Sequence, residues 1–200
     1  METADVLPIA VAFAAGYLIG SVPVAYPVVR AVGVDIREVG TRNPGAANVF
    51  RTVSRRLGVV VFTGDVLKGA AAVLIAWALG VPAEWLPVAG AAVIAGQWFP
   101  VFMRFRGGAG LAVGIGVALG LSPAPAAVGL AVGVLTIALI HNTTRSAAVG
   151  YVALVITSQL MGAGWLEPLS VTAIAGMLLL RLVVVTVLRR WRQPERQAQQ

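Results

Sequence analysis

Long apolar runs separated by short polar intervals are the feature that most constrains this chain. Several runs approach the length of about 20 residues that a helix needs to cross a hydrocarbon core about 30 Å thick. We expect seven membrane-spanning helices, over residues 6–25, 58–80, 86–103, 110–121, 124–140, 146–162 and 168–188. The sequence therefore predicts an all-α, polytopic integral membrane protein with a single transmembrane domain over residues 1–188.

The interval from 110 to 140 is too long for one span and too short for two full ones, because 31 residues make a helix of roughly 46 Å. Pro123 and Pro125 predict a break there. The first of the two resulting spans is short, so we expect it to be tilted, buried or seated in a locally thinned bilayer.

Composition excludes several other classes of protein. Of the 200 residues, 58% are hydrophobic and 12% are charged, whereas charged residues make up about a quarter of a soluble domain. The net charge is +7, but the sequence contains no polar domain of the kind that carries the basic residues of a nucleic-acid-binding protein. We therefore expect membrane lipids as partners and no nucleic acid. Cysteine is absent and His141 is the single histidine, so we expect no metal site and no cofactor. His141 itself is expected to be a capping or interface residue.

Charge predicts the orientation of the helices. With seven spans, one side receives only the acidic residues Glu2, Asp5, Glu84 and Glu167. The other side receives the arginines of the intervening loops and of a basic tail over residues 189–200, which we expect to be disordered. By the positive-inside rule the N-terminus is outside and the tail is cytoplasmic. The N-terminal run has no basic segment before it, so we expect a retained span and no cleaved signal peptide.

The longest polar interval, Val34–Leu57, is where we expect chemistry, and we call it the basic loop. Its arginines are Arg37, Arg42, Arg51, Arg55 and Arg56. They surround the small residues of Gly40–Asn48, where glycine lets backbone N–H groups turn toward a ligand and the guanidinium fork matches phosphate. A phosphate site is predicted. The alternative is a basic loop that only fixes membrane orientation.

A second short basic segment, Arg104–Gly110, repeats this pattern, and we call it the glycine turn. Arg104 and Arg106 precede glycines that open into an apolar helix, where backbone N–H groups can hold an anion. The alternative is a tight turn between two spans.

Three further polar residues lie at the ends of apolar segments. Asp65 and Lys68 share a helical face and are expected to pair with each other or with arginines of the basic loop, either as part of a site or as a clamp on that loop. Ser21 ends the first span two residues before Pro23, where a loosened helix could let it line the site.

Taken together, these motifs resemble those of the bacterial acyl-phosphate:glycerol-3-phosphate acyltransferases. The resemblance runs from residue 16 to about 120 and is most specific over Gly40–Arg51. It implies seven spans in the plasma membrane with active-site loops facing the cytoplasm. It also implies transfer of an acyl group from acyl phosphate to glycerol 3-phosphate, which gives lysophosphatidic acid and phosphate.

The resemblance also assigns residues to roles. Thr41, Asn48 and Arg51 occupy catalytic positions, with Thr41 where the family has serine. Asp65 and Lys68 are expected to support the site. The expected phosphate-binding residues are Ser21, Gly40, Arg42, Asn43, Gly45, Arg106, Gly107, Gly108 and Gly110.

The chain also departs from the family outside the basic loop. The family lysine of the glycine turn is Ala109, a histidine is Gln97, and a C-terminal histidine and asparagine are Leu182 and Val185. Two other hypotheses therefore stay open beside the acyltransferase. One is a non-catalytic binder of lipid precursors or a scaffold, and the other is a small transporter of a phosphorylated solute, for which an internal inverted repeat is expected.

Overall fold

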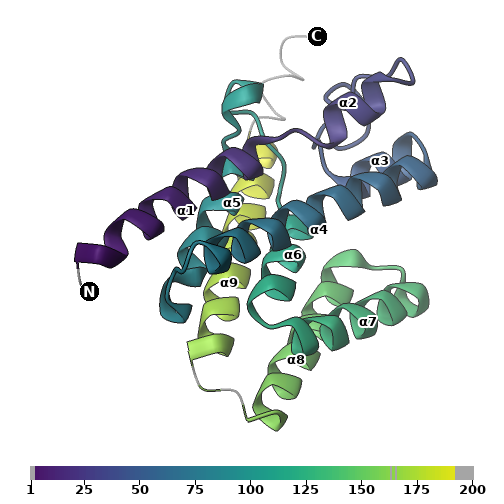
Figure 1. The fold of residues 1–200 in the computed structure, drawn as a ribbon. Helices are drawn as coiled ribbons and strands as arrows, with labels where there is room; N and C mark the ends of the chain where they lie inside the picture. The colour runs from purple at the N-terminus through teal and green to yellow at the C-terminus, as the bar shows by residue number, and fades with distance from the viewer. Residues whose placement is uncertain (1–2, 163, 165, 192–200) are drawn as a thin grey trace.

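The computed structural model describes residues 3–162, 164 and 166–191, and its regular structure there is entirely helical. The predicted all-α class is confirmed. Figure 1 shows the helices. In chain order they are α1 (Thr3–Ser21), α2 (Ala25–Arg30), α3 (Ala46–Thr52), α4 (Arg55–Ala78), η1 (Ala83–Trp85), α5 (Leu86–Trp98), η2 (Val101–Met103), α6 (Leu111–Leu121), α7 (Pro123–Ile140), α8 (Thr143–Leu160) and α9 (Leu166–Trp191).

Each predicted span overlaps one helix, namely α1, α4, α5, α6, α7, α8 or α9, although α6 has only 11 residues and α1 ends at Ser21. Within the described residues, four helical segments are long and apolar enough to cross a bilayer: Val6–Arg30, Arg55–Ala78, Ala83–Met103 and Pro123–Ile140. Two shorter apolar helices, Leu111–Leu121 and Pro168–Arg181, add to them. These lengths are those of an integral membrane protein.

The break between α6 and α7 falls where proline predicts it. Pro123 occupies the start of α7, a position that needs no backbone N–H, and Ser122 joins the two helices. The 11 residues of α6 make a helix of only about 16 Å. Val113 and Val117 on α6 are completely buried, so burial among other helices accounts for the short segment.

Three helix pairs cross at glycines. A β-carbon added at Gly96 of α5 would collide with a carbonyl oxygen of α1, and one at Gly116 of α6 would collide with a carbonyl oxygen of α4. Gly129 of α7 approaches the backbone of α8 in the same way. Small residues let helix backbones meet where lipid supplies no hydrophobic drive for association.

Buried apolar side chains form four clusters in the described residues, and two of them position the site. Figure 1 shows α7 and α8 as a hairpin beside the group formed by α1, α4, α5, α6 and α9, with α2 and α3 beside one end of α4. The main core joins α4, α5, α6 and α9 and consists of Ala72, Val73, Val93, Ile94, Val113, Val117, Ile174 and Leu178. A second core fixes α2, the basic loop and α4, through Ala25, Val29, Ile36, Val49 and Val61. The basic loop is therefore a packed structure.

Two sequence predictions concern the ends of helices. His141 is the C-cap of α7, with φ +51° and its backbone N–H bonded to Ile137 O at 3.0 Å, which agrees with the predicted capping role. Helix α9 continues to Trp191 and so takes in the first three residues of the predicted tail. The rest of that tail lies outside the described residues.

Candidate active site where the basic loop meets the glycine turn

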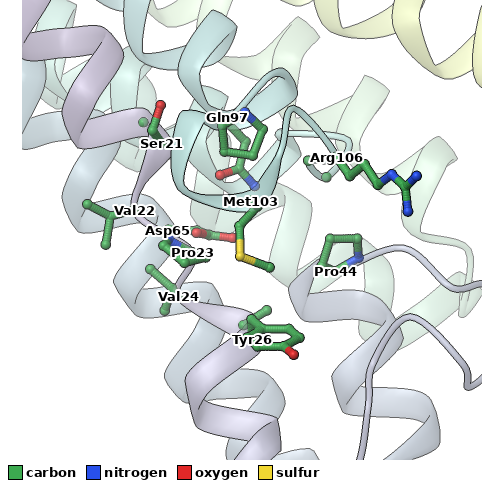
Figure 2. A pocket seen from close by; sticks show the side chains of 15 residues that line it. Ser21, Val22, Pro23, Val24, Tyr26, Pro44, Asp65, Gln97, Met103 and Arg106 are labelled. Carbon is green, nitrogen blue, oxygen red and sulfur yellow. The ribbon is translucent and has the colours of Figure 1, made fainter.

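A cleft opens where the chain breaks between α1 and α2. Its walls come from the ends of α1 and α5, the start of α2, the middle of α4 and the glycine turn (Figure 2). Figure 2 shows the Met103 side chain between Gln97 and Tyr26, with Arg106 beside Pro44. The lining residues are Gly20, Ser21, Val22, Pro23, Val24, Ala25, Tyr26, Pro44, Asp65, Gln97, Pro100, Met103, Arg106, Gly107 and Gly108.

Pro23 explains why α1 ends at this place. Proline has no backbone N–H, so helical bonding stops and carbonyl oxygens before it are left open. Lys68 Nζ donates to two of them, at 3.3 Å to Gly20 O and 3.0 Å to Val22 O. Ser21 is fully buried; its hydroxyl donates to Tyr17 O at 2.9 Å. These hydrogen bonds fix the backbone at the end of α1, where the helix stops and the cleft begins.

Asp65 and Lys68 form the ion pair that the sequence predicts. Lys68 Nζ lies 3.0 Å from Asp65 Oδ1 and also donates to Gln97 Oε1 at 2.5 Å, and both charged side chains are over 90% buried. The hydrogen bonds of Lys68 reach the α1–α2 break and α5, whereas the clamp hypothesis expected the basic loop as its partner. The carbonyls of Gly20 and Val22, next to Pro23, are the acceptors that a buried ammonium needs.

Asn48 holds the basic loop in shape. It is 2% exposed; its Oδ1 accepts from Thr41 N at 3.0 Å, and its Nδ2 donates to Val39 O at 3.1 Å. Gly40 has φ +56°, and a β-carbon there would collide with the Asn48 amide. The residue predicted to be catalytic therefore has both ends of its amide engaged with the backbone.

The two other expected catalytic residues, and the expected phosphate-binding Arg42, lie on the outside of the basic loop. Thr41, Arg42 and Arg51 are exposed, and none of them lines the cleft. Arg51 Nε donates to Ala47 O at 3.1 Å, which ties the exposed side chain to α3 through one of its nitrogens. Asn43 and Gly45, also predicted to bind phosphate, are half-buried beside Pro44.

The glycine turn is built differently from the predicted cradle of free backbone N–H groups. The N–H of Gly107 donates to Trp98 O at 3.2 Å and that of Gly108 to Gln97 O at 3.2 Å. A β-carbon at Gly108 would lie 3.2 Å from Pro44 O, so the turn and the basic loop touch there. These glycines are needed because backbones approach closely.

Two features at the start of α6 complete the turn. Gly110, predicted to bind phosphate, is the N-cap of α6 with φ +88°. Ala109, in the place of the family lysine, accepts a hydrogen bond from Trp98 Nε1 at 3.0 Å through its carbonyl oxygen. Arg106 is exposed and supplies the positive charge that lines the cleft from this turn.

Arg181, which had no predicted role, ties α9 to the same end of the bundle. Its Nη2 donates to Trp98 O at 3.2 Å, and its Cζ lies 4.9 Å from the Trp98 ring centroid and 5.1 Å from that of Phe99. An arginine within an apolar helix indicates a functional or structural contact, and this pattern could have pointed to Arg181. The side chains of Leu182 and Val185, the two C-terminal departures, lie outside the described residues.

The fold and the site together define a helical membrane protein with a cleft that is lined by Arg106 and lies beside the arginine-bearing basic loop. Such a protein suits an anionic substrate that reaches it from the membrane or the adjoining aqueous phase. The family model described as glycerol-3-phosphate acyltransferase matches residues 10–199, so the chain belongs to that family.

Individual relatives agree with this assignment. The glycerol-3-phosphate acyltransferase of Geotalea daltonii is 40% identical over 148 residues, which cover 72% of this chain and 76% of that protein. Glycerol-3-phosphate acyltransferase 1 of Deinococcus radiodurans is 48% identical over 96 residues, 48% of each chain. The crystal structure of PlsY, an integral membrane glycerol 3-phosphate acyltransferase, in its glycerol 3-phosphate form has a TM-score of 0.76 and 27% identity, and the match covers 94% of both chains.

Proposed function

We propose that this protein transfers an acyl group from acyl phosphate to glycerol 3-phosphate in phospholipid synthesis. The glycerol hydroxyl oxygen forms a bond to the acyl carbon, and the bond from that carbon to the phosphate oxygen breaks. Lysophosphatidic acid and phosphate leave, and the hydroxyl proton passes to the released phosphate or to water. The observation that carries this proposal is the contact of two arginine-bearing segments at Gly108 and Pro44, beside the cleft.

Acyl phosphate is already activated, so this chemistry requires binding and orientation and no covalent enzyme intermediate. Two anionic substrates must be held close together, and positive charge is the main requirement. Arg51, with Thr41, is the proposed phosphate site on the basic loop, and Arg106 serves the cleft. Asn48 keeps the basic loop in shape, while Asp65 and Lys68 keep the cleft open.

The proposed membrane topology is the one that the distribution of charges predicts. Seven spans, with the N-terminus outside, place the basic loop, the glycine turn and the C-terminus in the cytoplasm, where glycerol 3-phosphate is available. The chain has no cysteine, so single-cysteine variants report orientation directly. In intact cells Glu84→Cys should react with an impermeant maleimide and Thr41→Cys should react only after permeabilisation. Both positions are exposed, so labelling of Thr41→Cys from outside would contradict this topology.

Purified protein in detergent should release phosphate from palmitoyl phosphate only when glycerol 3-phosphate is added. Phosphate would be measured together with lysophosphatidic acid, and the two products should appear in equal amounts. Phosphate release without glycerol 3-phosphate would indicate a hydrolase. Binding of either substrate without any product would favour the non-catalytic binder, to which the absence of a lysine at position 109 also points.

A further inference from the structure

Arg37 of the basic loop is a cation without an anionic partner in the described part of the chain. Its backbone N–H donates to Asp35 Oδ1 at 2.9 Å, but its side chain makes no ion pair with a described residue. The guanidinium Nη2 lies 3.6 Å from Met103 Sδ, and Cζ lies 5.0 Å from the Tyr26 ring centroid. The Nε atom is buried and has no hydrogen-bond partner.

This set of contacts is poor for a half-buried guanidinium. Arginine has five N–H donors in a fixed fork, whereas a thioether sulfur is a weak acceptor and an aromatic face accepts no proton in a strong bond. Buried donors are almost always paired, and an unpaired one calls for an explanation. The two other described cations that are at least half-buried each have an oxygen acceptor. Lys68 bonds to Asp65, and Arg181 donates from Nη2 to a carbonyl, although its Nε, like that of Arg37, has no hydrogen-bond partner.

The neighbours of Arg37 place it beside the cleft. Met103 and Tyr26 both line the cleft, and Figure 2 shows these two side chains next to each other there. Of the described residues that line the cleft, Asp65 and Arg106 carry the charges, and Asp65 is already paired with Lys68. Arg37 does not itself line the cleft but contacts two residues that do, so an anion there would meet Arg106 directly and would lie next to Arg37 on the side of Tyr26.

We propose that Arg37 is a phosphate-binding residue of the cleft, which receives the phosphoryl group of one substrate in its unused donors. The Tyr26 ring and Met103 hold the guanidinium in place before the ligand arrives, which lowers the entropy lost on binding. The proposal rests on the proposed function for the identity of the substrates, which carry their phosphoryl groups as an acyl phosphate or as glycerol 3-phosphate.

The test compares Arg37→Gln with Arg37→Lys and with the control Arg30→Gln. Arg30 is exposed, lies seven residues earlier and contributes the same charge to the same side. The KM values for palmitoyl phosphate and glycerol 3-phosphate are measured separately, because the substrate that Arg37 binds should show the change. Binding of inorganic phosphate and of glycerol 3-phosphate to the purified protein is measured by titration calorimetry, so that a result is obtained even without turnover.

Arg37→Gln should raise one KM, or the Kd for phosphate, at least tenfold, with the melting temperature unchanged. Arg37→Lys should recover part of the loss, and Arg30→Gln should match the unchanged protein. Values for Arg37→Gln within twofold of the unchanged protein would overturn the inference while leaving the proposed function in place. A lower melting temperature with equal losses for both substrates would also overturn it, because Arg37 would then only join α2 to η2. Absence of phosphate binding in the unchanged protein would overturn it as well.

Discussion

Replacing Lys68 by methionine is expected to destabilise the protein more than any exposed substitution in the site. The change leaves the Asp65 carboxylate buried without its counter-ion, and it also leaves Gln97 Oε1 and the carbonyls of Gly20 and Val22 without their donor. Removing one partner of a buried ion pair costs about 3–5 kcal/mol. For a chain of this length that loss lowers the melting temperature by on the order of 10 °C. Thermal unfolding in detergent measures it.

The double variant Asp65→Leu/Lys68→Met provides the control. Removing both charges eliminates the unpaired carboxylate, so the double variant should be more stable than Lys68→Met alone. Full recovery is not expected, because the carbonyls at the α1–α2 break still lack a donor. Equal melting temperatures for Lys68→Met and the unchanged protein would mean that the pair does not hold the cleft.

The helices could be predicted well from the sequence, and the reason is physical. A hydrocarbon core forces backbone groups to pair within each segment, so an apolar run of suitable length has few alternatives to a helix. The break between α6 and α7 could be predicted from Pro123, because proline has no backbone N–H and a helix does not continue through it from Ser122. The predicted first span was less accurate, because Pro23 ends α1 at Ser21 and the chain restarts as α2.

The site was harder to predict, because the type of a residue indicates which contacts it can make but not which residue it contacts in the fold. Gly107 and Gly108 have the pattern of an anion cradle, yet their N–H groups bond to the end of α5. Asn48 was expected to be catalytic, and the structure shows that both ends of its amide bond to the backbone of the basic loop. Arg37 was counted among the basic residues of the loop without a role of its own. Only the packing of Tyr26 and Met103 around it separates it from its exposed neighbours.

Replacing Arg51 by alanine is expected to give the largest loss of activity among the exposed arginines. One hydrogen bond, from Nε to Ala47 O at 3.1 Å, ties its exposed side chain to α3 through one nitrogen, and the guanidinium has further donors for a phosphate. A fall in kcat/KM of about 10²-fold corresponds to about 2.7 kcal/mol of lost transition-state binding. Because the side chain is exposed, the melting temperature should stay within about 2 °C.

Arg55→Ala separates this specific role from the general positive charge of the basic loop. Arg55 is exposed, lies four residues later at the start of α4 and adds the same charge to the local field. If the loop only attracts anions through its general positive charge, the two variants should lose equal amounts of kcat/KM, and the loss should shrink as the ionic strength rises. A bound phosphate instead requires the fork of Arg51, so Arg55→Ala should keep kcat/KM within about threefold, a change worth less than 1 kcal/mol. Equal losses in the two variants would move the phosphate away from Arg51 and leave the cleft, with Arg106, as its site.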